Sequence, residues 1–211
     1  MKHLIIIGGG GMGKEIFYTA KHSIGYGTEF DIKGFLDDNV HSLDGFTGYP
    51  PVLNTIHDYQ PEPYDVFTCS IGDVHTKRKL CELIKSKGGR FQTLIHKEAQ
   101  LRENATIGKG TIIDCYAGIG SDAVVGENCL IQMYSGIAHD CKVGDYCRID
   151  VRAQLVGGVQ LGNNVTIHTN SIISHGVTIG DNAKVGALSF VIRKVKPGIT
   201  VQGNPAKRIE Y

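Results

Sequence analysis

Between residues 101 and 196 an aliphatic residue returns at every sixth position, and the register does not slip. A period of six fits neither an α-helix, which turns once in about 3.6 residues, nor a simple strand, which alternates from each residue to the next. It predicts a β-helix of hexapeptide repeats, in which short strands wind into a prism and stack coil upon coil. An ordinary β-sandwich would need longer strands and irregular turns. The aliphatic positions are Leu101, Ile107, Ile113, Ile119, Val125, Ile131, Ile137, Val143, Ile149, Leu155, Leu161, Ile167, Ile173, Ile179, Val185 and Val191.

Two other positions of the hexad repeat as well. Two residues before the aliphatic position, from Ala105 to Ala153, stands a small or β-branched side chain. One residue after it is often glycine, which we expect to supply the backbone freedom of a tight corner. These glycines are Gly108, Gly120, Gly126, Gly144, Gly162, Gly180 and Gly186. Three hexads make one coil of about 18 residues, so equivalent positions of successive coils should stack in columns, about 4.8 Å per coil.

The first 95 residues lack this repeat and alternate between apolar strands and helical stretches. The pattern predicts a Rossmann-like α/β half domain over 1–95, followed by a parallel β-helix domain over 96–211. Expected strands are 4–7, 32–36, 65–71 and 91–95, with helices at 13–22 and 74–87 and a loop with one short strand over 45–63.

A glycine motif joins the first strand to the first helix. Gly8, Gly10 and Gly13 satisfy G-x-G-x-x-G, whose bare backbone can approach a phosphate at a helix N-terminus. Asp37 and Asp38 end the second strand, where acidic residues can reach a ribose or base edge. Because about 95 residues hold only one mononucleotide half, a nucleotide-bearing substrate fits better than a nicotinamide cofactor. A glycine turn that only packs helix on strand, with aspartates that only solvate a strand end, is the alternative.

Composition excludes several classes of partner. The net charge of the 211-residue chain is +1, so neither nucleic acid nor an anionic membrane is indicated. The apolar run from Leu4 to Ile7 is too short for a signal peptide or a membrane span. The six cysteines include no CxxC pair, and three of them occupy the small inward position of the hexad. We therefore expect a cytoplasmic protein with reduced thiols.

His139 differs from the other histidines because of its column. Reading the sequence one coil at a time places His139 and Asp140 beneath Gly157 and Gly158, where absent side chains would leave room for a ligand. A histidine beside a carboxylate on a rigid coil suits a general base, with a solvated corner histidine as the alternative. His175 lies two coils away, roughly 10 Å, which is too far to share one zinc ion. We expect no metal site.

The C-terminal end departs from the repeat, as expected of a cap on an open solenoid. A basic cluster there would either be solvated or meet phosphates. Its members are Arg193, Lys194, Lys196, Lys207 and Arg208.

Together these residues resemble the bacterial nucleotide-sugar acetyltransferases, including the sialic acid O-acetyltransferase type and the N-acetyltransferases of UDP-4-amino sugars. The resemblance covers essentially the whole chain. The motifs that carry it are the glycine loop at 8–13, Gly34-Phe35-Leu36-Asp37-Asp38-Asn39, Ile71-Gly72-Asp73, His139-Asp140-Cys141 and Gly203-Asn204-Pro205-Ala206-Lys207. It implies a left-handed β-helix homotrimer that binds acetyl-CoA between adjacent helices, and an N-terminal domain that holds the nucleotide sugar.

The resemblance also implies roles for individual residues. His139 resembles the catalytic base and Asp140 its acidic neighbour. Residues expected to bind the nucleotide-linked substrate are Gly10, Gly11, Met12, Gly13, Asp37, Asp38, Gly72 and Asp73. Residues expected to bind acetyl-CoA are Arg148, Gly157, Thr169, Gly186, Ala187, Pro205 and Lys207. This sequence departs from the family at two of them, because relatives often have histidine where Met12 and Arg148 stand.

The expected activity is N-acetylation of a nucleotide-linked amino sugar, such as a UDP-4-amino-4,6-dideoxy sugar, by direct attack on the thioester. O-acetylation of a sugar hydroxyl, as on sialic acid, is the rival activity. A trimeric scaffold that binds nucleotide sugar without transfer is the non-enzymatic alternative. Only Asp37 and Asp38 separate the two activities, because they favour a nucleotide-linked substrate. The bare groove at Gly157 and Gly158 argues against the scaffold.

Overall fold

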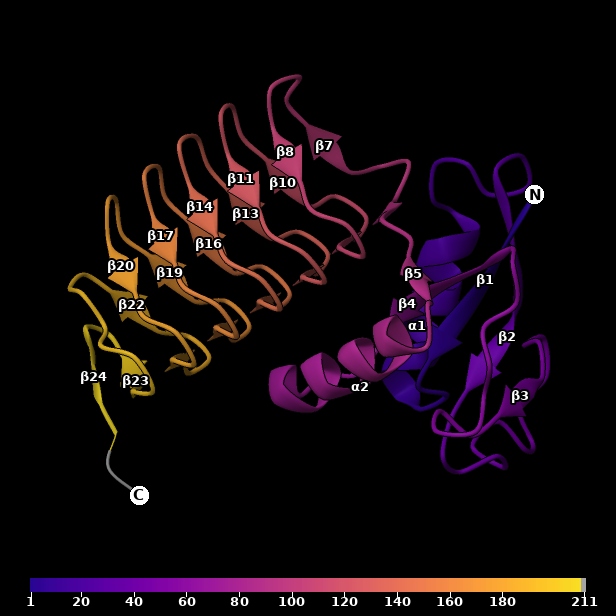
Figure 1. Ribbon diagram of the computed structural model, residues 1–211. Helices are drawn as coiled ribbons and strands as arrows, with labels where there is room; N and C mark the ends of the chain where they lie inside the picture. Colours follow the sequence, from indigo (N-terminus) through magenta and orange to yellow (C-terminus); the bar gives the residue numbers. More distant parts are fainter. Residues whose placement is uncertain (210–211) are drawn as a thin grey trace. The chain divides into compact units, whose positions relative to one another are not determined.

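The computed structural model describes residues 1–209 and divides into two compact units, Met1–Lys97 and Glu98–Tyr211. The first unit is an α/β domain and the second is a parallel β-helix, which confirms the predicted fold class (Figure 1).

A parallel five-stranded sheet forms the centre of the first unit, with strand order β3-β2-β1-β4-β5. Its strands are β1 (Lys2–Ile7), β2 (Phe30–Leu36), β3 (Val52–Asn54), β4 (Asp65–Cys69) and β5 (Arg90–Phe91). Every residue of β4 and the whole apolar end of β1 are buried, as in strands covered on both faces. The order reverses between β1 and β4, and such a switch point is where open α/β sheets bind ligands.

The boundaries differ from the sequence predictions in two places. Strand β4 ends at Cys69, and the hydroxyl of the following Ser70 lies 2.8 and 3.0 Å from the carbonyl oxygens of Ile7 and Gly8. The strand expected over 91–95 is instead two short strands, β5 and β6 (Leu94–Ile95). Between them the amide of Gln92 donates to the carbonyl oxygen of Phe67 on β4, at 2.9 Å.

Two helices follow the two strands at the switch point. The N-cap of helix α1 (Gly11–Lys21) is Gly10, which has no side chain to cap the helix. The N-cap of helix α2 (Val74–Ser86) is Asp73, whose carboxylate accepts a hydrogen bond from the amide of Thr76 at 2.8 Å. The N-terminus of α1 therefore has no side-chain cap, whereas α2 is capped by its own chain.

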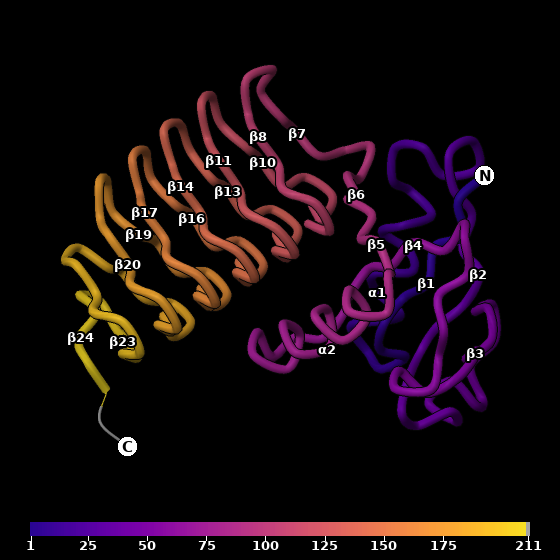
Figure 2. Tube along the Cα trace, viewed as in Figure 1, coloured from indigo at the N-terminus to yellow at the C-terminus, as the bar shows by residue number. Residues whose placement is uncertain are grey.

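Three sheets form the walls of the second unit, parallel except where β24 pairs antiparallel with β23. The coils follow one another in the tube of Figure 2. The first face comprises β7 (Gln100–Leu101), β10 (Gly118–Ile119), β13 (Gly136–Ile137), β16 (Gln154–Leu155), β19 (Ile172–Ile173) and β22 (Phe190–Val191). The second comprises β8 (Thr106–Ile107), β11 (Val124–Val125), β14 (Lys142–Val143), β17 (Gln160–Leu161) and β20 (Thr178–Ile179). The third comprises β9 (Ile112–Ile113), β12 (Leu130–Ile131), β15 (Arg148–Ile149), β18 (Thr166–Ile167), β21 (Lys184–Val185), β23 (Thr200–Gly203) and β24 (Ala206–Arg208).

The register between coils confirms the column map. Gly118 pairs with Gly136, and Ile149 pairs with Ile167, each at the equivalent position of the next coil. The aliphatic positions point inward, so Ile131, Ile149 and Ile167 are fully buried. Every coil thus adds one more layer to the same narrow apolar core.

The glycine that follows the aliphatic residue has a different role from the one expected. A Cβ added at Gly120 would lie 2.7 Å from the carbonyl carbon of Ala138 and 2.7 Å from the amide nitrogen of His139 on the next coil. Its backbone is not in the left-handed region, which is occupied a little later in the turn, as at Asp122 with φ 59°. The glycine therefore permits close approach of coils, and the expectation of special backbone freedom there was wrong.

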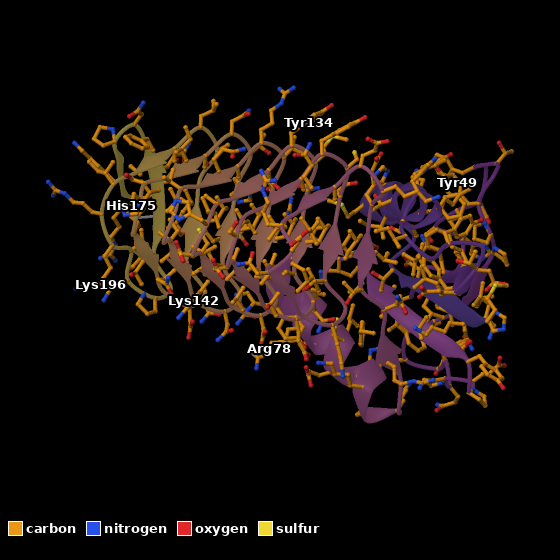
Figure 3. All side chains as sticks on the ribbon, turned by 90° about the horizontal axis from the view of Figure 1, so that it is seen from above. Tyr49, Arg78, Tyr134, Lys142, His175 and Lys196 are labelled. Carbon is orange, nitrogen blue, oxygen red and sulfur yellow. The ribbon has the colours of Figure 1, made fainter. Side chains whose placement is uncertain are left out.

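The left-handed corner residue recurs throughout the solenoid. It lies three positions after the aliphatic residue and is most often Asn or Asp, which tolerate this conformation best after glycine. Its members are Gly110, Tyr116, Asp122, Asn128, Tyr134, Asp140, Tyr146, Arg152, Gly158, Asn164, Asn170, Gly176, Asn182 and Leu188. Figure 3 shows Tyr134 projecting from one such corner and Lys142 from the opposite side.

Replacing Gly120 with alanine should destabilise the β-helix by about 1–3 kcal/mol, because backbone on the next coil cannot yield to the added methyl group. Gly118→Ala is the matched control, since a Cβ there meets no atom within 4 Å. Denaturant unfolding at one protein concentration measures both free energies. Equal stability of the two variants would contradict the assigned role of Gly120.

The buried carboxylate of Asp65 should make the first unit sensitive to acid. Burial raises the pKa of Asp65, but hydrogen bonds from the Tyr59 hydroxyl, the Glu62 amide and the Lys33 ammonium outweigh it and hold the pKa below its ordinary value. The resulting stabilisation is present above the unfolded-state pKa of about 3.9 and is lost as pH falls through the lower folded-state pKa.

We therefore expect Asp65→Asn to cost about 1–3 kcal/mol at neutral pH and to flatten the loss of stability on acidification. Asp44→Asn, at an exposed carboxylate, is the control. Thermal unfolding in a series of buffers from neutral to acidic pH gives both quantities. An acid limb as steep in Asp65→Asn as in the wild type would exclude this carboxylate as its cause.

Candidate active site

His139 and Asp140 form a hydrogen-bonded pair at the corner between the first and second faces, here called the first corner (residues 138–141 and their equivalents one coil apart). Nδ1 of His139 lies 2.7 Å from Oδ2 of Asp140, and the two side chains are 62% and 66% exposed. Asp140 adopts the left-handed conformation, with φ 60°. The carboxylate therefore orients the ring through Nδ1 and leaves Nε2 on the opposite side of the ring from this hydrogen bond.

Gly157 accommodates the imidazole ring of His139. A Cβ added at Gly157 would collide with Nε2, Cε1 and Cδ2 of that ring. The bare backbone, which was expected to leave room for a ligand, is thus partly covered by the histidine itself. The neighbouring Gly158 is glycine for a different reason, because its φ of +75° lies in the left-handed region. Gly157 therefore supports the His139 ring.

Cys141 follows the pair but points into the core. It is fully buried, its thiol donates to the carbonyl of Val156 at 3.4 Å, and burial raises its pKa. A buried thiol with a raised pKa is a poor nucleophile. Cys141 is therefore unsuited to covalent catalysis.

A second feature, a groove of about 590 Å³, lies at the corner where the third face turns into the first. We call this turn the third corner (residues 168–171 and their equivalents). The groove brings together Thr169, Gly186 and Ala187, three of the residues expected to bind acetyl-CoA. Its remaining lining, which the sequence reasoning missed, is His168, Lys184, Thr200 and Gln202.

Two of the missed residues carried a usable signal in the sequence. His168 lies one coil before Gly186 in the same column, because Ile167 pairs with Val185. Lys184 stands two positions before Gly186, at the start of β21, and both flank the inward-facing Val185. The column map could therefore have placed both side chains in the groove.

Two other expected cofactor residues lie beside this groove along the chain. Pro205 follows a cis peptide bond in the turn between β23 and β24. Lys207 lies on β24 and pairs with Gln202, whose side chain lines the groove. Arg148, on the same face, has its Nε 2.5 Å from Oδ1 of the buried Asp150.

Within one chain the histidine pair and the groove lie at different corners of the coil. His139 and Gly157 follow strands of the first face, whereas Thr169 and Gly186 follow strands of the third. The structure therefore separates Gly157 from the other residues expected to line a cofactor cleft. Within one chain, the first corner carries His139 and the third corner carries the groove.

The first unit gathers its expected residues at the carboxyl ends of β1, β2 and β4. A Cβ added at Gly10 or Gly11 would meet no described atom within 4 Å, whereas one at Gly13 would collide with the carbonyl of Gly8. Gly10 and Gly11 thus leave open backbone, and Gly13 allows the helix to pack closely. Met12 stands in the first turn of α1 beside them.

The aspartates of this unit have structural roles that the sequence did not reveal. Asp37 accepts from the amide of Gly9 at 2.6 Å and from that of Asn39 at 2.9 Å. Asp38 accepts from the amide of Ile56 at 3.1 Å. Asp73 caps α2, next to Gly72. Asp37 therefore fixes the shape of the glycine loop, whatever else it binds.

Residues 1–209 hold no group of three His, Cys, Asp or Glu side chains placed to bind a metal ion. His175, which lies two coils after His139 in the same column, is toward the C-terminal end of the solenoid (Figure 3). No helix in the described range is long and apolar enough to cross a membrane.

Comparison with known families accounts for both units. Residues 3–84 match the PglD N-terminal domain, and residues 122–153 and 158–193 match the bacterial transferase hexapeptide (six repeats). The chain therefore joins a PglD-type N-terminal domain to hexapeptide repeats of the bacterial transferase type. These two matches confirm the resemblance seen in the motifs.

Individual relatives are similar over part or all of the chain. The UDP-N-acetylbacillosamine N-acetyltransferase of Bacillus subtilis (strain 168) is 30% identical over 117 residues, 54% of this chain and 51% of that protein. The chain thus matches about half the length of this curated relative. The acetyltransferase domain of PglB from Neisseria gonorrhoeae FA1090, in complex with acetyl coenzyme A, is 28% identical, with a TM-score of 0.86 and 99% of each chain covered.

A third structure is similar in fold alone. PerB from Caulobacter crescentus, in complex with CoA and GDP-perosamine, has a TM-score of 0.90 at 24% identity, and the match covers 100% of this chain and 98% of that one.

Gly157→Ala should displace the His139 ring without unfolding the coil. The added methyl group would collide with the His139 side chain, which can rotate away. The measurement is the ring ¹⁵N and ¹H NMR signals of His139. We expect them to shift in Gly157→Ala and to stay in place in Gly118→Ala. Unchanged signals in Gly157→Ala would contradict the packing of the ring on Gly157.

Proposed function

We propose that the protein is an acetyl-CoA-dependent N-acetyltransferase that acts on the amine of a nucleotide-linked amino sugar. The observation that carries the proposal is the His139–Asp140 pair, with Nδ1 held by a carboxylate and the ring packed on Gly157. The family relatives support it, since one is named an N-acetyltransferase of a UDP-linked sugar and another holds acetyl coenzyme A. A UDP-4-amino-4,6-dideoxy sugar is the substrate we favour.

His139 acts as the general base in this proposal. The amine nitrogen forms a bond to the thioester carbonyl carbon, Nε2 of His139 takes the amine proton, and the carbon–sulfur bond breaks to release CoA. Asp140 holds the Nδ1 proton and stabilises the imidazolium that forms. Because a thioester is already activated, positioning and one base are sufficient, and no acyl-enzyme is needed.

The amide of Gly157 is suited to stabilise the tetrahedral oxyanion. The Gly158 amide is already engaged by the carbonyl oxygen of His139, at 2.9 Å. The Gly157 amide, in contrast, donates to no acceptor within residues 1–209. A free backbone donor next to the base is the geometry that acyl transfer requires.

The first unit is proposed to bind the nucleotide. The uncapped N-terminus of α1 and the open backbone of Gly10 and Gly11 can receive phosphate oxygens. Asp37 shapes that loop, and Asp38, Gly72 and Asp73 border it from the neighbouring strands. Met12 is then a determinant of sugar identity, because it replaces a histidine that relatives often have.

The separation of base and groove supports assembly as a homotrimer. If acetyl-CoA lies in the groove at Thr169, Gly186 and Ala187, then His139 must come from the first corner of a neighbouring subunit. Pro205 and Lys207 would border the same cofactor. All six cysteines are free, which is consistent with the cytoplasmic location we propose.

The test is CoA release, followed with a thiol reagent, from acetyl-CoA and a panel of UDP-, dTDP- and GDP-linked amino sugars. Release with one 4-amino sugar is the expected result. Release with sialic acid alone would move the assignment to O-acetylation. Binding of nucleotide sugar with no thioester cleavage would show a non-catalytic scaffold.

His139→Ala should lower turnover at least a hundredfold, within the ~10²–10⁴-fold that general base catalysis contributes. His175→Ala is the matched control, since it removes the histidine of the same column two coils away. We expect its turnover to equal that of the wild type, with both variants eluting like the wild type on size exclusion. A near-wild-type rate for His139→Ala would remove His139 from the mechanism.

A further inference from the structure

A buried carboxylate links two side chains that the proposed reaction does not use. Asp150 is only 5% exposed at its side chain, and it lies 2.5 Å from Nε of Arg148 and 2.9 Å from Nδ1 of His168. Each contact engages a different carboxylate oxygen. A buried carboxylate is retained only when it is paired, so Arg148 and His168 together satisfy Asp150.

The coil register makes this arrangement specific. Ile149 pairs with Ile167 across β15 and β18, which places Asp150 directly beside His168 in the next coil. The following members of that column are Gly186 and Gln202, both in the groove lining. A Cβ added at Gly186 would lie 2.9 Å from the side chain of Gln202, so Gln202 covers this glycine, and His168 and Gln202 both line the groove.

The pairing also determines which atom His168 offers to the groove. With Nδ1–H donated to Asp150, the neutral ring presents Nε2 as a hydrogen-bond acceptor. His168 lines the groove and is 40% exposed, and its Nε2 has no protein partner within residues 1–209. Lys184 supplies a cation to the same groove. The groove therefore contains one fixed acceptor beside a positive charge.

We propose that His168 is a specificity-determining residue for the acyl donor, and that Asp150 and Arg148 are positioning residues that hold its ring. The inference rests on the proposed function. A CoA thioester carries amide and hydroxyl donors along its pantetheine arm and phosphates beyond it. Nε2 of His168 accepts from one of those donors, and Arg148 acts through Asp150 without touching the donor. This differs from the direct cofactor contact first expected of Arg148.

The test measures CoA binding by calorimetry and steady-state kinetics on the full-length chain. We expect His168→Phe to raise the Kd for CoA and the KM for acetyl-CoA about tenfold, with kcat and the KM for the sugar within about twofold, because loss of one net hydrogen bond corresponds to a factor of about ten. His3→Phe is the matched control, because His3 is also 40% exposed and pairs through Nδ1 with a carboxylate, that of Asp31. It should change nothing.

Asp150→Asn tests the positioning role independently of activity. In the wild type, ¹⁵N NMR should show neutral His168 protonated at Nδ1, and this preference should be lost in Asp150→Asn. The effects of His168→Phe and Asp150→Asn on the Kd should not add in the double variant, as expected of residues that act as one unit.

The outcomes separate the two proposals. Weaker CoA binding in His168→Phe but not in His3→Phe supports the inference. Equal CoA binding by the wild type and His168→Phe overturns it while leaving the acetyltransferase assignment intact. If the wild type binds no CoA and releases none from acetyl-CoA, both proposals are wrong.

Discussion

The structure of the second unit depends on the close, regular approach of one coil to the next. Backbone amides of each coil donate to carbonyls of the following coil, as from Gly120 to Ile137 and from Ala138 to Leu155. That spacing leaves no room for a side chain at positions such as Gly120, and it aligns every column of residues along the axis. The chemistry at each corner follows from which side chains share a column.

The two corners use this regularity differently. At the first corner Gly157, stacked on His139, leaves room for the imidazole ring beside the backbone. At the third corner His168 pairs with a buried carboxylate of the preceding coil and lines a groove together with Gly186 and Gln202. Both histidines are oriented through Nδ1 by an aspartate, once from the adjacent residue in the chain and once from the adjacent coil. Rigid coils therefore hold two oriented imidazoles without dedicated loops.

The sequence predicted much of this because hexads convert directly into columns. The β-helix, its register and the adjacency of His139, Asp140 and Gly157 all follow from counting. Counting could not show where side chains point. It did not reveal that the His139 ring covers Gly157, that Arg148 turns to Asp150, or that Asp37 binds the glycine loop. It also misread Gly120, because a steric limit between coils and a backbone turn both favour glycine.

A crystal structure of the protein with CoA tests the central claim most directly, which is that base and groove meet in one acetyl-transfer site. We predict that the pantetheine arm lies along Thr169 and Gly186 of one subunit. Its sulfur should lie within about 4 Å of Nε2 of His139 from the neighbouring subunit, close enough for the substrate amine to reach both. CoA bound away from this groove, or with its sulfur remote from every His139, would contradict the account.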